Sequence, residues 1–196
     1  MKLVLASQNK KKLVEMNDIL SQLGVEVCSE AEAGVDVEVE ETGTTFEENS
    51  LLKAKAVMEA SGMPAIADDS GLCVDALNGA PGVYSARYGG EGLDDVGRYR
   101  LLLENMRGQT PRTAKFVSVI TCCFPNGDVL TARGECPGTI AFAPMGEGGF
   151  GYDPVFFLPP LKKTFAQLSP EEKNAISHRG KALAAFREQL ETYLNP

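Results

Sequence analysis

The chain of 196 residues has one histidine, no tryptophan and no apolar run long enough to cross a bilayer. Residues 1–7 lead directly into a polar segment and lack the long apolar core and cleavage site of a secretion signal. We therefore expect a cytoplasmic protein without a membrane anchor. The five cysteines are odd in number and include no Cys-x-x-Cys pair. A zinc site or a disulfide framework is not expected, and the thiols should be reduced.

Basic side chains are absent from a long stretch of this acidic chain. The formal net charge is −8, and no Lys or Arg occurs between Lys12 and Lys53, where every charged residue is Asp or Glu. Long DNA or RNA requires a basic surface, so we do not expect the chain to bind either. A solvated acidic surface explains most of these carboxylates, and binding of a divalent cation is the alternative for a few.

Hydrophobic spacing changes repeatedly between the period of strands and that of helices. Strands are predicted over residues 2–6, 25–27, 35–39 and 65–67, and a long β-hairpin at about 113–136 turns at Asn126-Gly127. Helices are predicted from Asn9 to Gly24, from Thr45 to Gly62, and over residues 94–106 and 180–194. This interleaving indicates one α/β domain, residues 1–196, with a mixed sheet and two lobes.

Two segments next to predicted strands carry groups that suit phosphate and metal. The first consists of Ser7, Gln8, Asn9, Lys10, Lys11 and Lys12. It opens a helix, whose free N–H groups attract phosphate; an ordinary capped helix with solvated lysines is the alternative. The second, Asp68-Asp69-Ser70, follows a strand, and ligands gather at the carboxyl ends of strands in α/β sheets. Two carboxylates suit Mg²⁺, whereas an Asp-capped turn is the alternative.

Three further groups complete the candidates. Glu40-Glu41 precede a helix on which Lys53 lies one turn after Asn49, although a solvated helix face explains these residues equally well. Phe150-Gly151-Tyr152-Asp153 ends a Gly-rich loop that could stack and hydrogen-bond a nucleobase, or simply connect two strands. Lys173, His178 and Arg179 precede the last predicted helix and offer donors for phosphate or a base carbonyl; a lone histidine also commonly serves a structural role.

Six strings in this order resemble the inosine triphosphate pyrophosphatase family, the XTP/dITP diphosphatases, over almost the whole chain. They are Ser7-x-Asn9-x-x-Lys12, Thr45-Phe46-x-Glu48-Asn49-x-x-x-Lys53-Ala54, Ala67-Asp68-Asp69-Ser70-Gly71-Leu72, Ala80-Pro81-Gly82-Val83-Tyr84-Ser85-Ala86-Arg87-Tyr88, Gly149-Phe150-Gly151-Tyr152-Asp153-Pro154-Val155-Phe156 and Ser177-His178-Arg179. Ser50, where many relatives have Ala, is a minor departure.

The resemblance implies a fold and an activity. The fold is a strongly twisted mixed sheet flanked by helices, with the active cleft between two lobes, usually in a homodimer. The activity is Mg²⁺-dependent hydrolysis of ITP, dITP and XTP to the monophosphate and pyrophosphate, which removes deaminated purines from the nucleotide pool. By position, the resemblance assigns the triphosphate to residues 7–12 and Lys53, and Mg²⁺ to Glu41 and Asp69. It also makes Asp69 the base, with Asp68 beside it.

The same resemblance places the substrate contacts at Ser70, the purine at residues 150–153, and the base and phosphates at Lys173, His178 and Arg179. We expect water to attack the α-phosphorus, and we expect donors facing the 6-keto oxygen to reject 6-amino purines. Guanine shares that 6-keto group, so its exclusion has to arise at position 2. A Maf-type nucleotide pyrophosphatase of other base specificity and a non-catalytic nucleotide sensor are the alternatives.

Overall fold

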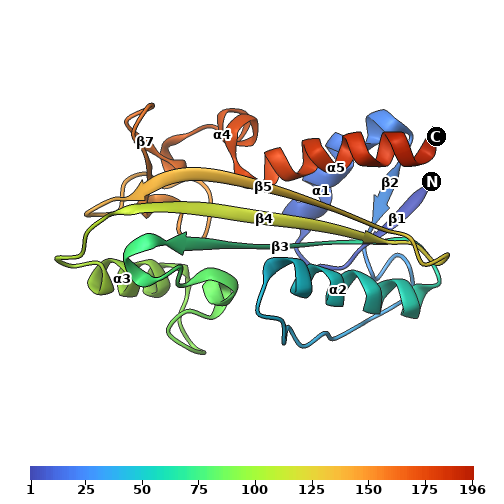
Figure 1. Ribbon diagram of the computed structural model, residues 1–196, viewed down its shortest axis with the longest axis horizontal. Helices are drawn as coiled ribbons and strands as arrows, with labels where there is room; N and C mark the ends of the chain where they lie inside the picture. Colours follow the sequence, from blue (N-terminus) through green and yellow to red (C-terminus); the bar gives the residue numbers. More distant parts are fainter. The chain divides into compact units, whose positions relative to one another are not determined.

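The computed structural model describes all 196 residues and contains one seven-stranded sheet, in the order β2-β1-β3-β4-β5-β6-β7 (Figure 1). The strands are β1 (Lys2–Leu5), β2 (Glu26–Cys28), β3 (Ala65–Val74), β4 (Thr113–Cys123), β5 (Val129–Ile140), β6 (Phe156–Leu158) and β7 (Lys163–Thr164). β1 runs parallel to β2 and β3, whereas β6 is antiparallel to β5 and β7. The predicted mixed sheet is confirmed.

The helices are α1 (Lys10–Leu20), α2 (Phe46–Ser61), α3 (Asp95–Asn105), α4 (Pro170–Ile176) and α5 (His178–Leu194). Local sequence explains where the first three begin, because Asn9, Thr45 and Asp94 each accept a backbone N–H of the first turn. Gly62 ends α2 with a φ of 69°, a conformation that favours glycine. None of the helices combines the length and the hydrophobicity that crossing a membrane would require.

The chain forms two compact units. Unit 1 comprises Met1–Asp69, Ser118–Gly134 and Lys181–Pro196, and unit 2 comprises Ser70–Val117 and Glu135–Gly180. β3, β4 and β5 each pass from one unit into the other. The long hairpin predicted around Asn126-Gly127 is β4 and β5, closed by a bond from Phe124 N to Asp128 O of 2.9 Å.

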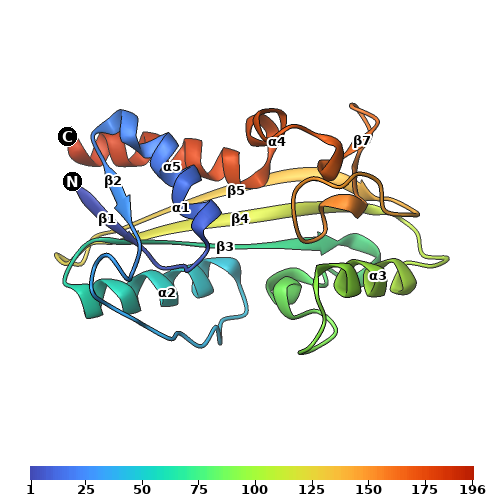
Figure 2. The ribbon, with the colours of Figure 1, turned by 180° about the vertical axis from the view of Figure 1, so that it is seen from behind.

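In unit 1, helices cover both faces of the strands (Figures 1 and 2). On one face, Met16 of α1 and Phe186 of α5 pack with Leu3, Ile66 and other fully buried strand residues. On the other face, Ala54 and Val57 of α2 pack against β1 and β3. This second layer fixes α2, which carries Lys53, against β3, which bears Asp68 and Asp69.

Unit 2 has its own core. Leu102 and Met106 of α3 belong to one buried cluster with Leu72, Phe116 and Phe156. Phe116 and Phe156 meet edge to face, with ring centroids 4.5 Å apart. The cluster anchors the segment from Tyr152 to Phe165, which follows the Gly-rich loop.

One predicted strand is wrong, and one predicted strand end lies elsewhere. Residues 35–39 alternate between half-buried and exposed, as the pattern suggested, but they pair with no strand, and the amide of Val37 donates to the Glu30 carboxylate instead (3.2 Å). The strand that starts at Ala65 continues to Val74, so Asp68 and Asp69 lie inside β3 and not at its end. It is the neighbouring strand β1 that ends close to Asp68 and Asp69, because its pairing with β3 stops at Leu5 opposite Ile66.

Helix α4 was not predicted, although the sequence carries its signal. Ser169 and Glu172 form a reciprocal capping box, and Pro170 occupies the first turn. The last helix also begins two residues before the predicted boundary, so His178 and Arg179 belong to the first turn of α5. Its helical pattern was weak there because both residues are polar yet buried.

Candidate active site

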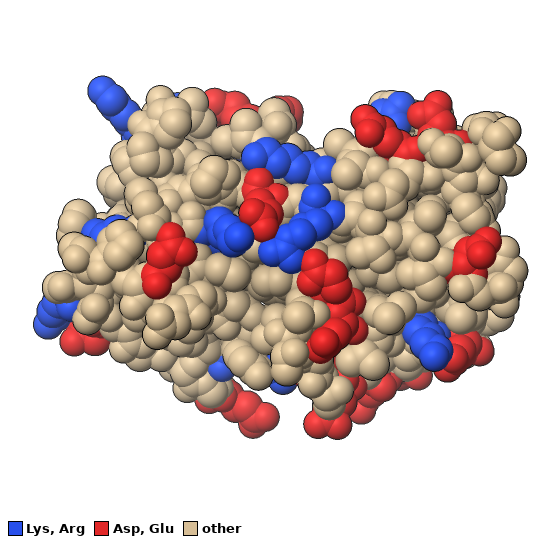
Figure 3. All heavy atoms as spheres, viewed as in Figure 1, with Lys and Arg blue, Asp and Glu red and all other residues tan.

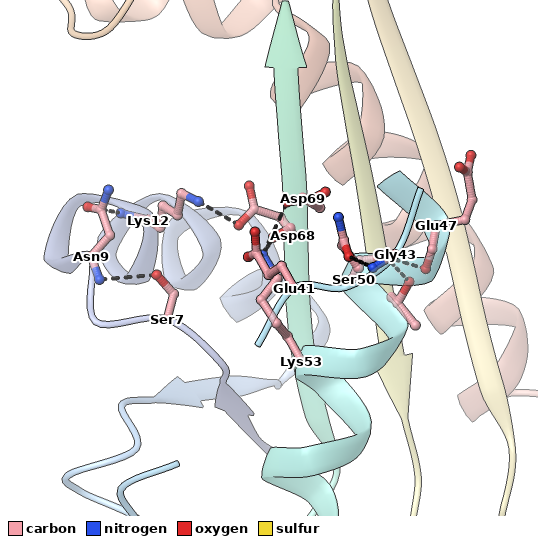
Figure 4. Close-up of polar contacts among 12 residues, drawn as sticks. Ser7, Asn9, Lys12, Glu41, Gly43, Glu47, Ser50, Lys53, Asp68 and Asp69 are labelled. Carbon is pink, nitrogen blue, oxygen red and sulfur yellow. Dashed lines mark hydrogen bonds and ion pairs between the residues drawn. The ribbon is translucent and has the colours of Figure 1, made fainter. Parts of the chain in front are cut away.

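The segment before α1 is folded by its own polar side chains (Figure 4). The Asn9 carboxamide oxygen accepts the amides of Lys11 (3.0 Å) and Lys12 (3.3 Å), and the Ser7 hydroxyl accepts the amide of Asn9 (3.1 Å). Gln8, Asn9, Lys10 and Lys11 are exposed. The lysine that turns inward is Lys12, whose Nζ lies 2.8 Å from Asp68 Oδ1. The prediction that residues 7–12 open a helix is confirmed.

Asp68 and Asp69 are both buried, at 2% and 7% exposure. Successive residues of a strand point to opposite faces, so the two carboxylates have different partners. Asp68 pairs with Lys12 of α1, whereas Asp69 Oδ1 lies 3.3 Å from Lys53 Nζ of α2. Both residues lie just beyond the point where β1 stops pairing with β3. They are therefore next to the carboxyl end of β1, and not at the end of β3 as the sequence suggested.

Lys53 is the centre of this site. Its Nζ donates to the backbone oxygen of Asp68 (2.7 Å) and lies 3.0 Å from Glu41 Oε1 and 3.3 Å from Asp69 Oδ1 (Figure 4). Burial lowers the pKa of Lys53, but the charges of Asp69, Asp68 and Glu41 outweigh that effect and raise it. The ammonium is therefore charged and joins two carboxylates from distant parts of the chain.

Asp69 has a strongly perturbed carboxylate. Burial raises its pKa from 3.8 to about 6; Glu41 and Asp68 add to the increase, and Lys53 opposes it. Its second oxygen, Oδ2, is buried and has no hydrogen-bond partner. A buried carboxylate oxygen without a donor is costly, and a cation or a water molecule would satisfy it. A carboxylate with this environment is a candidate for acid–base chemistry.

Glu41 and Asp69 fit a magnesium ion. Mg²⁺ binds through one or two carboxylates and completes its coordination with water and substrate phosphates. Glu41 and Asp69 provide two carboxylates around one ammonium, and the free Asp69 Oδ2 is a further ligand atom. No group of three or more His, Cys, Asp or Glu side chains is arranged to hold a metal ion. Two carboxylates leave most of the coordination positions of a Mg²⁺ ion to water or other ligands.

Unit 2 contains a second cluster, in which charged side chains surround the aromatic ring of Phe150. This ring is 44% exposed; Lys173 Nζ lies 4.7 Å and Arg179 Cζ 5.7 Å from its centroid. Asp153 is buried, binds Lys173 Nζ at 2.6 Å and accepts the amide of Phe150 at 3.1 Å. Burial raises the pKa of Asp153, and Lys173 opposes the increase. The exposed ring and its two cations provide a face on which a heteroaromatic base can stack.

The other predicted base-binding residues support this group from within unit 2. Tyr152 is buried, and its hydroxyl donates to the backbone oxygen of Ser85 (2.6 Å), so its side chain points into the core. The amide of Gly151 donates to Asp95 Oδ2 (3.0 Å). Gly149 has a φ of 69°, and a Cβ there would overlap the Asp153 carboxylate, so only glycine fits.

His178 and Arg179 are buried in the first turn of α5, at 7% and 8% exposure. The imidazole of His178 stacks on Phe116 with centroids 4.7 Å apart and planes 13° apart. Ser70 is half-buried within β3. Asn49 and Ser85, which the sequence analysis named only within motifs, are buried and accept backbone amides, of Gly43 and Leu72 respectively. Sequence spacing alone does not reveal that these two side chains are buried.

Charges of both signs are mixed on the face that Figure 3 shows. Surface ion pairs join Arg133 to Glu47 (2.7 Å) in unit 1 and Lys115 to Glu135 (3.2 Å) in unit 2. Each of these pairs is partly exposed and contributes little stability. The positive charge with defined geometry is instead at Lys12, Lys53 and Lys173, each held by a buried aspartate.

Comparison with known proteins gives consistent matches over nearly the whole chain. Similar proteins include a dITP/XTP pyrophosphatase of Desulforamulus reducens, 52% identical over 192 residues (97% of this chain, 96% of the relative), and one of Haemophilus influenzae, also 52% identical (96% and 98%). The structure of a Ham1 protein from Staphylococcus aureus has a TM-score of 0.92 at 44% identity, covering 98% of this chain and 100% of that one. Residues 3–189 match the model of the Ham1 family, and the chain belongs to that family.

Proposed function

We propose that the protein hydrolyses dITP, XTP and ITP to the nucleoside monophosphate and pyrophosphate. Relatives named dITP/XTP pyrophosphatase, about half identical over almost the full length, support this activity. The observation in the structure that carries it is the group around Lys53. A buried ammonium joins Glu41 and Asp69 and leaves Asp69 Oδ2 without a partner.

Hydrolysis of a triphosphate requires neutralised phosphate charge and an aligned water molecule. Lys12 and Lys53 supply positive charge held in place by ion pairs, and the positive end of α1 favours a phosphate beside it. Glu41 and Asp69 would hold Mg²⁺, which when bound polarises the phosphoryl oxygens that it contacts.

Asp69 would also orient the attacking water and take its proton. The raised pKa of Asp69, about 6 without metal, places its basicity closer to neutral pH than that of an ordinary aspartate. Asp68, next to Asp69, pairs with Lys12. This ion pair would keep the start of α1 close to β3.

The group around Phe150 would bind the base. Phe150 offers a stacking face, and Lys173, His178 and Arg179 would donate to the 6-keto oxygen or to phosphate. A 6-amino purine would direct its own donor at these donors, and its rejection follows. Asp153 and Tyr152 would hold this group in place, and Ser70 would contact the substrate.

Two further expectations belong to the same proposal. We propose a cytoplasmic location, since the five cysteines form no disulfide. We also propose a homodimer, as the resemblance to the inosine triphosphate pyrophosphatase family implies. A Maf-type pyrophosphatase or a nucleotide sensor remains the alternative function. Sensing alone would not require the buried acid at Asp69 with its unsatisfied oxygen.

Pyrophosphate release from ITP, XTP, dITP, GTP and ATP, with and without Mg²⁺, tests the activity. We expect release from the first three with Mg²⁺ and little from GTP or ATP. Preference for a modified pyrimidine triphosphate would support the Maf-type alternative, and binding without release would support a sensor. Hydrolysis in ¹⁸O-labelled water should label the monophosphate, because water attacks the α-phosphorus. Label in pyrophosphate would contradict that step.

A further inference from the structure

We propose that Asn49 is a positioning residue that holds Glu41 in its place beside Lys53 through a hydrogen bond to Gly43. The inference rests on the proposed function in one respect, that Glu41 binds the metal. Asn49 lies in the first turns of α2 and is completely buried, although asparagine is ordinarily a surface residue.

The bond in question joins the loop before α2 to the helix itself. Asn49 Oδ1 accepts the amide of Gly43 at 2.8 Å. A Cβ at residue 43 would lie 2.6 Å from Asn49 Oδ1 and 2.7 Å from Glu48 Cβ, closer than real Cβ atoms approach. The loop therefore contacts α2 at Gly43, where the lack of a Cβ permits the close approach.

A second bond holds the next residue of the loop. Glu48 Oε2 accepts the amide of Thr44 at 2.7 Å, and the Thr45 hydroxyl caps the helix by accepting the amide of Glu48 at 3.1 Å. Thr45 and Glu48 thus form a shifted capping box, because the Glu48 side chain accepts the amide of Thr44 and not that of Thr45. Between them, Asn49 and Glu48 secure two successive amides.

Glu41 precedes Gly43 by two residues, and its carboxylate returns to the same helix at Lys53 (3.0 Å). Lys53 lies one turn after Asn49, so both side chains project from one face of α2. The four residues close a ring in which Asn49 holds the loop at Gly43 and Lys53 holds it at Glu41 (Figure 4 labels Glu41, Gly43 and Lys53). Without the Gly43 bond, the nearest remaining bond from the loop to α2 is at Thr44, and the Glu41 carboxylate itself is held by an ion pair that a metal would disturb.

The unused half of the Asn49 amide points to the same role. Asn49 Nδ2 is buried and has no hydrogen-bond partner, which is unfavourable for a polar group. An aspartate would accept the Gly43 amide without that orphaned donor. It would, however, add a third carboxylate close to Lys53, whose single ammonium already pairs with Glu41 and Asp69. A neutral acceptor at this position secures the loop and leaves the charge balance of the site unchanged.

The test compares Asn49→Ala with Ser50→Ala. Ser50 is the neighbouring buried polar residue of α2, and its hydroxyl lies 2.6 Å from the Thr121 hydroxyl and does not touch the loop. Both variants should lower stability, so Ser50→Ala controls for a general loosening of the helix. Amide hydrogen exchange at residues 42–44 is measured on the metal-free protein, and the Mg²⁺ concentration for half-maximal pyrophosphate release is measured with XTP.

For Asn49→Ala we expect exchange at Gly43 to become about 5- to 10-fold faster, the loss of one hydrogen bond. We expect the half-saturating Mg²⁺ concentration to rise about 10-fold, while kcat at saturating Mg²⁺ stays within about 3-fold. Ser50→Ala should change neither quantity by more than about 2-fold. Asn49→Asp, which retains the acceptor, should keep Gly43 protected.

Unchanged Gly43 exchange in Asn49→Ala, or an equal loss of protection in Asn49→Asp, would overturn the proposal. So would a Mg²⁺ dependence that shifts as much in Ser50→Ala as in Asn49→Ala. Absence of pyrophosphate release from the wild-type protein would refute the proposed function instead. The exchange experiment needs no substrate and would still decide whether Asn49 holds the loop.

Discussion

Replacing Asp69 with asparagine should stabilise the metal-free protein at neutral pH while it abolishes turnover. Burial, together with Glu41 and Asp68, raises the pKa of Asp69 from 3.8 to about 6 despite the opposing charge of Lys53. Each pKa unit corresponds to about 1.4 kcal/mol, so the ionised side chain costs the folded state about 3 kcal/mol. Asparagine resembles the protonated acid and does not carry this cost.

The pH dependence has a definite sign. The folded state binds the Asp69 proton more tightly than the unfolded state, so the wild type loses stability as the pH rises from about 4 to about 6. The carboxamide that Asp69→Asn introduces does not titrate. The free-energy advantage of the variant should therefore be close to zero at pH 4 and reach about 3 kcal/mol at pH 7.

Urea denaturation in EDTA at pH 4, 5, 6, 7 and 8 measures this difference. Asp18→Asn, at an exposed position of α1, controls for the change in net charge. Adding Mg²⁺ at pH 7 should stabilise the wild type and not Asp69→Asn, because only the wild type retains both carboxylates. A variant that is less stable than the wild type at pH 7 without metal would refute the reasoning, since Lys53 would then outweigh burial.

Three further variants test other parts of the structure. Ser50→Ala should lower the free energy of unfolding by about 1–2 kcal/mol in urea denaturation, because the buried Thr121 hydroxyl loses its partner, and an unchanged value would contradict the 2.6 Å bond. Lys173→Met should lower it by about 3 kcal/mol or more, since Asp153 is left buried without its ion pair, and should raise KM for XTP; Lys173→Arg, which retains the charge, is the control. Gly149→Ala should cost about 1–3 kcal/mol and raise KM for XTP, since the left-handed backbone and the Asp153 carboxylate leave no room for a Cβ; Gly151→Ala, with a similar φ but open space, should cost less. Wild-type KM in Gly149→Ala would show that the loop adapts.

Local sequence signals were sufficient wherever a structural feature depends on neighbouring residues. Asn9, Thr45 and Gly62 mark helix ends because a cap requires only a side chain and the backbone a few residues away. The hairpin at Asn126-Gly127 follows from turn geometry in the same way. The undetected helix α4 carries an equally local signal at Ser169 and Glu172.

Features that depend on pairing with distant segments could not be read in this way. Residues 35–39 have the alternation of a strand, yet no neighbouring strand accepts their hydrogen bonds, and they remain an extended loop. The length of β3 depends on the strands beside it, so a strand expected to end at residue 67 continues to Val74. Tyr152, expected at the base, turns inward because the backbone oxygen of Ser85 is available to its hydroxyl.

The sequence by itself determined which chemical groups this protein has: scattered lysines, paired aspartates, a Gly-rich loop, and an acidic chain with a single histidine. Their order along the chain was enough to indicate the family. The tertiary structure alone decided what each group does to the others. Residues 41, 53 and 69 lie far apart in sequence, and packing of α2 against β1 and β3 brings their charges within 3.3 Å. Burial raises the pKa of Asp69 and leaves Asn49 Nδ2 and Asp69 Oδ2 without partners, because a pKa and an unsatisfied atom depend on three-dimensional surroundings and not on spacing.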